Sequence, residues 1–157
     1  MDNSKYLVKA AVIAAVYIAL TLLLMPISYG FMQIRIAEAL TVLPAITHAA
    51  IPGLFIGCLV SNILGPYGLV DMVFGSIATL LAAFATYKLR KRTLLVPLPP
   101  VIANGLIIGP MLYYVYGVPV SLLACILWVA AGEAIACYCI GLPLLKYLDK
   151  RKTSIGL

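Results

Sequence analysis

The chain has 157 residues, of which 64% are hydrophobic and 10% charged, and its mean hydropathy is +1.12. A soluble domain carries roughly 25% charged residues, so this composition excludes a soluble globular protein and indicates one integral membrane domain over residues 1–157. The net charge of +6 comes from short Lys and Arg clusters beside apolar segments, a pattern typical of membrane topology signals rather than of nucleic-acid binding.

The first apolar segment predicts a membrane-spanning helix over residues 6–25. Its length suits a hydrocarbon core of ~30 Å, and Pro26 ends it. Ala11, Ala15 and Ala19 follow one another at helical spacing and form a smooth stripe that another helix could approach closely. The stripe fits either packing within this protein or docking of a partner membrane protein.

Residues 34–64 form a long apolar segment that is interrupted by proline and glycine and contains charged side chains. We expect two short helices, 34–46 and 50–64, that turn near His48 on the cytoplasmic side. Each is about 20 Å long at the α-helical rise, which is short for a bilayer unless neighbours shield it or the membrane is thinned. His48 itself is expected to be a solvated or capping residue.

Three further spans are predicted at 67–89, 94–116 and 120–145. Basic clusters lie at the N-terminus, at 88–92 and after residue 145, and the positive-inside rule assigns all three to the cytoplasm. Only an even number of crossings between them achieves this. The predicted fold is therefore an all-α membrane protein of six transmembrane helices with both termini cytoplasmic.

This topology gathers polar and aromatic side chains from several helices in the outer half of the membrane. Ionisable residues inside a bilayer are costly and are functional candidates by default. The candidates for substrate binding are Arg35, Glu38, Asn62, Asp71, Asn104, Tyr113, Trp128 and Glu133.

Each candidate also has a structural interpretation. Arg35 and Glu38 are spaced to pair, and either neutralise each other or share one member with a ligand. Asp71 opens a helix, where a capping role is favoured. Glu133 could accept two N–H bonds from a guanine-like edge, with Asn104 beside a ring carbonyl, or both could join helices.

The aromatic candidates and the missing motifs narrow the chemistry further. Tyr113 and Trp128 could stack on a flat heterocycle. The sequence has no Gly-rich phosphate loop with its lysine, no HExxH, and no nucleophile–base pair, so we expect no enzyme activity, no metal and no cofactor. The four cysteines, which are expected to be small buried hydrophobic residues, are Cys58, Cys125, Cys137 and Cys139.

Several separate blocks resemble the QueT family, whose members are substrate-binding S components of energy-coupling factor (ECF) transporters for queuosine precursors. The blocks are residues 34–44 (IRIAEALTVLP), 51–57 (IPGLFIG), 71–76 (DMVFGS), 97–100 (PLPP) with Asn104, and Gly132-Glu133.

The resemblance implies a bacterial multi-pass membrane protein that binds a 7-deazaguanine at the outer face. Such a ligand is 7-aminomethyl-7-deazaguanine, 7-cyano-7-deazaguanine or queuine. The implied partners are a transmembrane T component, which would dock on the alanine stripe of the first helix, and two cytoplasmic ATPases that alone bind ATP. It also implies that the loop 26–33 gates the site and that the loaded protein topples in the membrane. The alternatives are an S component for another vitamin or heterocycle, and a membrane scaffold that transports nothing.

Overall fold

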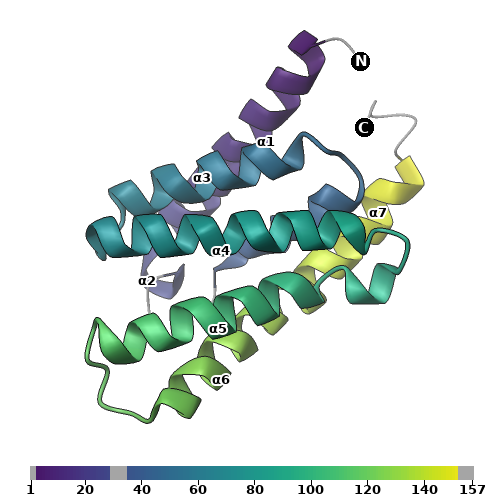
Figure 1. Ribbon diagram of the computed structural model, residues 1–157. Helices are drawn as coiled ribbons and strands as arrows, with labels where there is room; N and C mark the ends of the chain where they lie inside the picture. Colours follow the sequence, from purple (N-terminus) through teal and green to yellow (C-terminus); the bar gives the residue numbers. More distant parts are fainter. Residues whose placement is uncertain (1–2, 29–34, 152–157) are drawn as a thin grey trace.

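The computed structural model describes residues 3–28 and 35–151, and every regular element in these two ranges is helical (Figure 1). The expected all-helical fold is confirmed. In chain order the elements are α1 (Asn3–Leu23), α2 (Met25–Ser28), η1 (Ile36–Ala45), α3 (Ala50–Leu64), α4 (Gly68–Lys88), η2 (Thr93–Leu95), α5 (Leu98–Tyr114), α6 (Leu122–Ala134), η3 (Ile135–Gly141) and α7 (Leu142–Arg151).

Four helical segments of the described chain are long and apolar enough to cross a membrane: Asn3–Leu23, Gly68–Lys88, Thr93–Tyr114 and Leu122–Arg151. Two shorter apolar helices, η1 and α3, lie among them. Large apolar side chains such as Leu7, Phe84 and Leu106 are exposed on the outside of the bundle. An apolar exterior of this kind is what contact with lipid requires.

Helices α1 and α3 pack at very short range because α3 carries two glycines on the face toward α1. A Cβ atom at Gly53 would lie 2.7 Å from the carbonyl oxygen of Ala10, and one at Gly57 would lie 2.9 Å from the Cβ of Tyr17. Small residues four apart allow such close approach between helices in membranes. This contact holds the inner face of α1, including Tyr17, against the rest of the bundle.

The predicted short helix 34–46 is instead a 3₁₀ helix, η1, over Ile36–Ala45, and Ile34 lies outside the described residues. Runs of 3₁₀ helix longer than three or four residues are uncommon. In an α-helix the ring of Pro44 would clash with the carbonyl of Leu40, which disfavours α-helical winding here. At a rise of about 2.0 Å per residue, η1 also reaches further than an α-helix of equal residue count.

Each of the three faces of η1 meets a different part of the bundle. Side chains three apart are aligned in a 3₁₀ helix. Ala37, Leu40 and Leu43 belong to the apolar core with α1 and α3, whereas Val42 packs with Leu145 of α7. The third face carries the polar residues Glu38 and Thr41, both of which are buried. Residues 37–44 are all buried, so η1 is the centre around which the other helices are arranged.

The last helix is continuous from Leu122 to Arg151, past the predicted end at 145, and its middle part, η3, is a π-helix. The backbone of η3 lies very close to η1, because a Cβ at Gly141 would be 2.9 Å from the carbonyl oxygen of Ala39. Wide π turns are rare and are often found at functional sites. This one sets Cys137 beside the polar face of η1.

The two ends of the bundle differ in charge. The start of α1, the α4–α5 connection and α7 lie at one end, and the α3–α4 and α5–α6 connections lie at the other (Figure 1). The turn around His48 belongs to the first of these ends, since its ring contacts Tyr87 near the end of α4 edge-to-face, with centroids 4.8 Å apart. The basic residues of α4, α7 and the start of α1 therefore gather at this end.

Candidate functional site

A buried ion pair joins η1 to α4. Nη2 of Arg35 lies 2.9 Å from Oδ2 of Asp71, and the two side chains are 7% and 1% exposed. Asp71 is in the first turn of α4, but that helix has no side-chain cap, so the predicted capping role is wrong. Its carboxylate is turned inward to the guanidinium instead. Arg35 also interacts electrostatically with Glu38, the partner that its sequence spacing suggested.

Asn62 of α3 holds the Asp71 member of this ion pair in place through a hydrogen bond to its backbone. Its Nδ2 donates to the carbonyl oxygen of Asp71 at 3.0 Å and contacts the sulfur of Cys58 at 3.4 Å. Gly75 of α4 leaves the space that the amide needs, since a Cβ there would lie 2.6 Å from Nδ2. The side chain of Asn62 is completely buried, and its amide is held in one orientation.

Glu38 receives a hydrogen bond from α1. The phenol of Tyr17 donates to Oε1 of Glu38, and both side chains are buried. This contact connects the inner face of the first helix to the polar face of η1. The other oxygen, Oε2, has no hydrogen-bond partner among the described residues.

Glu133 approaches the same place from α6. The thiol of Cys137, one turn further along, lies 3.8 Å from Oε2 of Glu133 and 3.4 Å from the carbonyl oxygen of Glu38. Thr41 donates to that same carbonyl at 2.6 Å. Glu133 is 4% exposed and interacts electrostatically with Glu38 and Arg35. Two carboxylates from distant parts of the chain therefore share one interior region.

We call the set Tyr17, Arg35, Glu38, Asn62, Asp71 and Glu133 the buried polar cluster. A buried polar atom without a partner costs roughly 1–3 kcal/mol, so unpaired atoms are rare in folded proteins. In the described part of the chain, this cluster leaves three buried acceptor atoms unpaired: Oε2 of Glu38, Oδ1 of Asn62 and Oδ1 of Asp71. An arrangement with surplus acceptors is suited to a ligand that supplies N–H groups.

Three further sequence candidates are not members of the buried polar cluster as defined above. Asn104 is buried in α5, and its Nδ2 has no partner among the described residues, so it offers a free donor. Trp128 and Tyr113 are 37% and 39% exposed, and the ring of Tyr113 contacts Tyr114. These two aromatic residues are on the surface of the bundle rather than in the cluster.

Sequence reasoning missed Tyr17 and Cys137. A tyrosine midway along a membrane span is unlike the tyrosines of the interfacial belts, because its hydroxyl needs a partner in the interior. The position of Tyr17 in the middle of a span is therefore the sequence feature that indicates a buried polar role for it. Cys137 was expected to be a buried hydrophobic residue, and Cys58 and Cys125 are buried as well, but Cys139 is exposed, contrary to expectation.

Two expectations concern surfaces near the cluster. Ala11, Ala15 and Ala19 are exposed, whereas Ala14, on the neighbouring face of α1, is buried. The alanine stripe is therefore not used for packing within the described chain. Of the predicted gating loop 26–33, residues 29–33 lie outside the described residues.

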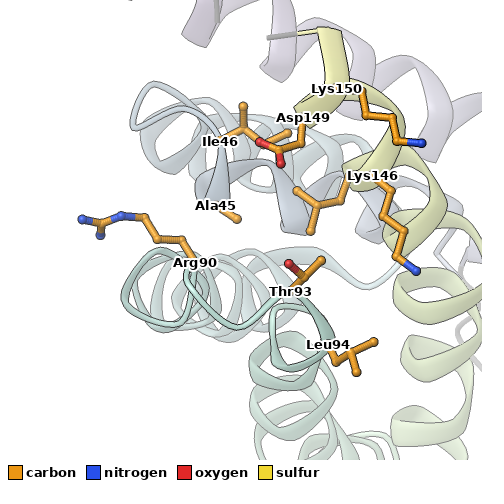
Figure 2. A pocket seen from close by; sticks show the side chains of 9 residues that line it. Ala45, Ile46, Arg90, Thr93, Leu94, Lys146, Asp149 and Lys150 are labelled. Carbon is orange, nitrogen blue, oxygen red and sulfur yellow. The ribbon is translucent and has the colours of Figure 1, made fainter.

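A cavity of about 440 Å³ lies at the basic end of the bundle, away from the cluster (Figure 2). Its apolar floor includes Ile46 and Leu145, and charged residues of the α4–α5 connection and α7 surround it. The carboxylate of Asp149 points toward Ile46, while Arg90 and Lys150 extend away from the cavity (Figure 2). The basic residues here belong to the clusters from which the positive-inside rule predicts the topology.

Comparison with known proteins gives two matches. The model of the family described as QueT transporter matches residues 7–150. A curated protein of Lactococcus lactis subsp. cremoris (strain MG1363), named "Queuosine precursor transporter QueT", is 37% identical over 76 residues. This alignment covers 47% of the chain and 44% of that relative, so the chain spans less than half of the length of the curated protein it matches. No solved structure matches.

The family match extends over nearly the whole chain, including η1, α4 and α6, which carry the buried polar cluster. The helices that could span a membrane lie within the same range. The chain is accordingly a multi-pass protein of the bacterial cell membrane and belongs to the QueT transporter family.

Proposed function

We propose that this protein is the S component of an ECF-type importer and binds a queuosine precursor in the buried polar cluster. The observation that carries the proposal is a set of three acceptor oxygens inside an apolar bundle, on Glu38, Asn62 and Asp71, that have no partner in the part of the chain that the structure describes. A relative named as a queuosine precursor transporter supports the substrate class.

A 7-deazaguanine offers the groups that such a cluster lacks. Its pyrimidine edge presents adjacent N–H donors, which a carboxylate accepts as a pair. Glu133 suits this role, because the contact that its carboxylate makes among the described residues is a weak thiol interaction with Cys137 at 3.8 Å. The unpaired Nδ2 of Asn104 supplies a donor for the ring carbonyl. Trp128 and Tyr113 would need to move inward to stack on the ligand.

Six crossings are the topology that fits this function. Four long helices and the shorter η1 and α3 make six apolar segments. The common end for the start of α1, the α4–α5 connection and α7 supports a cytoplasmic location for all three basic clusters (Figure 1). The cluster then lies toward the outer side, with segment 26–33, which begins within α2, as its gate.

The energy would come from partners, namely a transmembrane T component and two cytoplasmic ATPases. The exposed stripe of Ala11, Ala15 and Ala19 supports docking on α1, because small residues let another helix approach closely. After docking, the loaded protein would topple and present its site to the cytoplasm. Exposed apolar side chains around the bundle suit a body that rotates within lipid.

The test is uptake in a bacterial host that can neither make nor import queuosine precursors. The protein is expressed with or without an energy-coupling module (T component and two ATPases), and queuosine in tRNA is measured after 7-aminomethyl-7-deazaguanine is added. The proposal predicts queuosine only when protein and module are both present. Uptake by the protein alone would overturn the S-component role, and no uptake with a module that forms a complex with the protein would overturn the substrate.

A further inference from the structure

The charges of the buried polar cluster do not balance. It contains three carboxylates, on Glu38, Asp71 and Glu133, and one guanidinium, on Arg35. Arg35 forms the 2.9 Å ion pair with Asp71 and also interacts electrostatically with Glu38 and Glu133. The other basic residues of the described chain belong to the start of α1, the end of α4 with its following turn, and α7, at the far end of the bundle.

An excess of negative charge in an apolar interior is expensive. Moving a carboxylate out of water costs several kcal/mol unless an opposite charge or a proton accompanies it. One guanidinium cannot neutralise three carboxylates. The cluster is therefore better matched by a ligand that brings its own positive charge.

The carboxylates of Glu38 and Glu133 differ in the hydrogen bonds that they already accept, so they suit different ligand groups. On Glu38, Tyr17 occupies Oε1 and fixes the orientation of the group, so Oε2 is left as a single, directed acceptor. A single acceptor suits a point charge such as an alkylammonium group. Within the two described ranges, the contact to the carboxylate of Glu133 is a weak one from the thiol of Cys137 to Oε2, which suits the paired N–H donors of a ring edge.

We infer that Glu38, oriented by Tyr17, selects ligands by charge and binds the ammonium group of an aminomethyl substituent, so that cationic deazaguanines are preferred over the neutral cyano analogue. This inference rests on the proposed function, because it presumes that a deazaguanine occupies the cluster. In this inference the carboxylate of Glu38 determines the specificity for the 7-substituent. Glu133 binds the ring, which all these ligands share.

The experiment is calorimetric titration of the detergent-purified protein with 7-aminomethyl-7-deazaguanine and with 7-cyano-7-deazaguanine. The two ligands share the ring and differ in the charge of the substituent. A hydrogen bond to a charged group predicts that the wild-type protein binds the aminomethyl compound about ten- to a hundredfold more tightly. Equal affinity for both compounds would overturn the charge selection and leave the proposed function standing. Binding of neither would overturn the proposed function itself.

Two matched variants test which carboxylate causes the preference for the aminomethyl compound over the cyano compound. Glu38→Gln keeps the shape but removes the charge, so it should weaken binding of the aminomethyl compound about ten- to a hundredfold and leave the cyano compound within about threefold. Glu133→Gln should weaken both compounds by similar factors and keep their affinity ratio. Equal losses for both compounds in Glu38→Gln would overturn the role of Glu38. The wild-type comparison decides charge selection even if a variant fails to fold.

Discussion

The hydroxyl of Tyr17 on α1 donates a hydrogen bond to the carboxylate of Glu38 on η1, so the first helix contributes directly to the buried polar cluster. The opposite face of α1 carries the exposed alanines at positions 11, 15 and 19. One helix thus presents a proposed docking surface to the outside and a site residue to the inside. Any rotation of α1 that follows docking would move Tyr17 relative to Glu38.

Replacing Tyr17 with Phe keeps the ring that packs against α3 and removes the hydroxyl. Glu38 then loses the donor that fixes its orientation, and a lost hydrogen bond of about 0.5–1.5 kcal/mol corresponds to a roughly 2- to 13-fold weaker affinity for the aminomethyl ligand. Calorimetric titration measures the change. Tyr147→Phe on α7, whose ring stays beside Arg151, is the control and should bind like the wild type. Unchanged affinity in Tyr17→Phe would show that this bond does not prepare the site.

Removing one partner of the Arg35–Asp71 ion pair leaves the other charge buried. Asp71→Asn is therefore expected to destabilise the fold by about 3–5 kcal/mol, as found for broken buried pairs. Thermal unfolding in detergent, followed by circular dichroism, reports the loss as a lower Tm. Asp149→Asn, at the basic end of the bundle, is the matched control and should leave Tm nearly unchanged. Equal Tm values for the two variants would contradict a structural role of the pair.

The close contact between α1 and α3 leaves no room for a side chain on Gly57. In Gly57→Ala the new Cβ would lie 2.9 Å from the Cβ of Tyr17, so α1 must shift. Overpacking of this kind costs typically 1–3 kcal/mol, and here it also displaces the hydroxyl from Glu38. We expect a lower Tm together with weaker ligand binding. Ile56→Ala, on an exposed part of the same helix, should change neither, and a Gly57→Ala variant that also changes neither would refute the tight contact.

Docking and binding are separable on α1. Ala15 is exposed, so Ala15→Leu should leave the interior, and hence ligand affinity, unaltered. The larger side chain would prevent close approach of a T component, so uptake with the energy-coupling module should be lost. Val16→Leu adds a methylene to a neighbouring exposed position and is the control, with uptake retained. If Ala15→Leu lost ligand binding as well, the stripe would have a role other than docking.

The composition was sufficient to predict the helical membrane class, because 64% hydrophobic residues with few charges leave no other environment for this chain. The polar residues inside apolar segments could be identified for the same reason. Their partners could not. Arg35 lies three residues from Glu38 in the sequence, yet its guanidinium forms an ion pair with Asp71, 36 residues away, because η1 packs against α4.

The conformation of η1 also escaped prediction. An apolar segment of ten residues with one proline has no periodic signal that separates a 3₁₀ helix from a short α-helix, and burial on all sides removes the amphipathic pattern on which such a distinction depends. The same limit applies to η3, an apolar segment whose Gly141 lies close to η1. Trp128 is a stacking candidate by residue type and by its depth along the last span, but its exposed position depends on how α6 is rotated in the bundle.

The central claim is that the buried polar cluster binds a queuosine precursor, and the most direct measurement is calorimetric titration of the purified protein with 7-aminomethyl-7-deazaguanine, with riboflavin as a control ligand. The account predicts tight, saturable binding of the deazaguanine that is weakened in Glu133→Gln, and no binding of riboflavin. Binding that survives in Glu133→Gln, Glu38→Gln and Asp71→Asn alike would contradict the location of the site. Absence of binding to any deazaguanine by the folded protein would contradict the account as a whole.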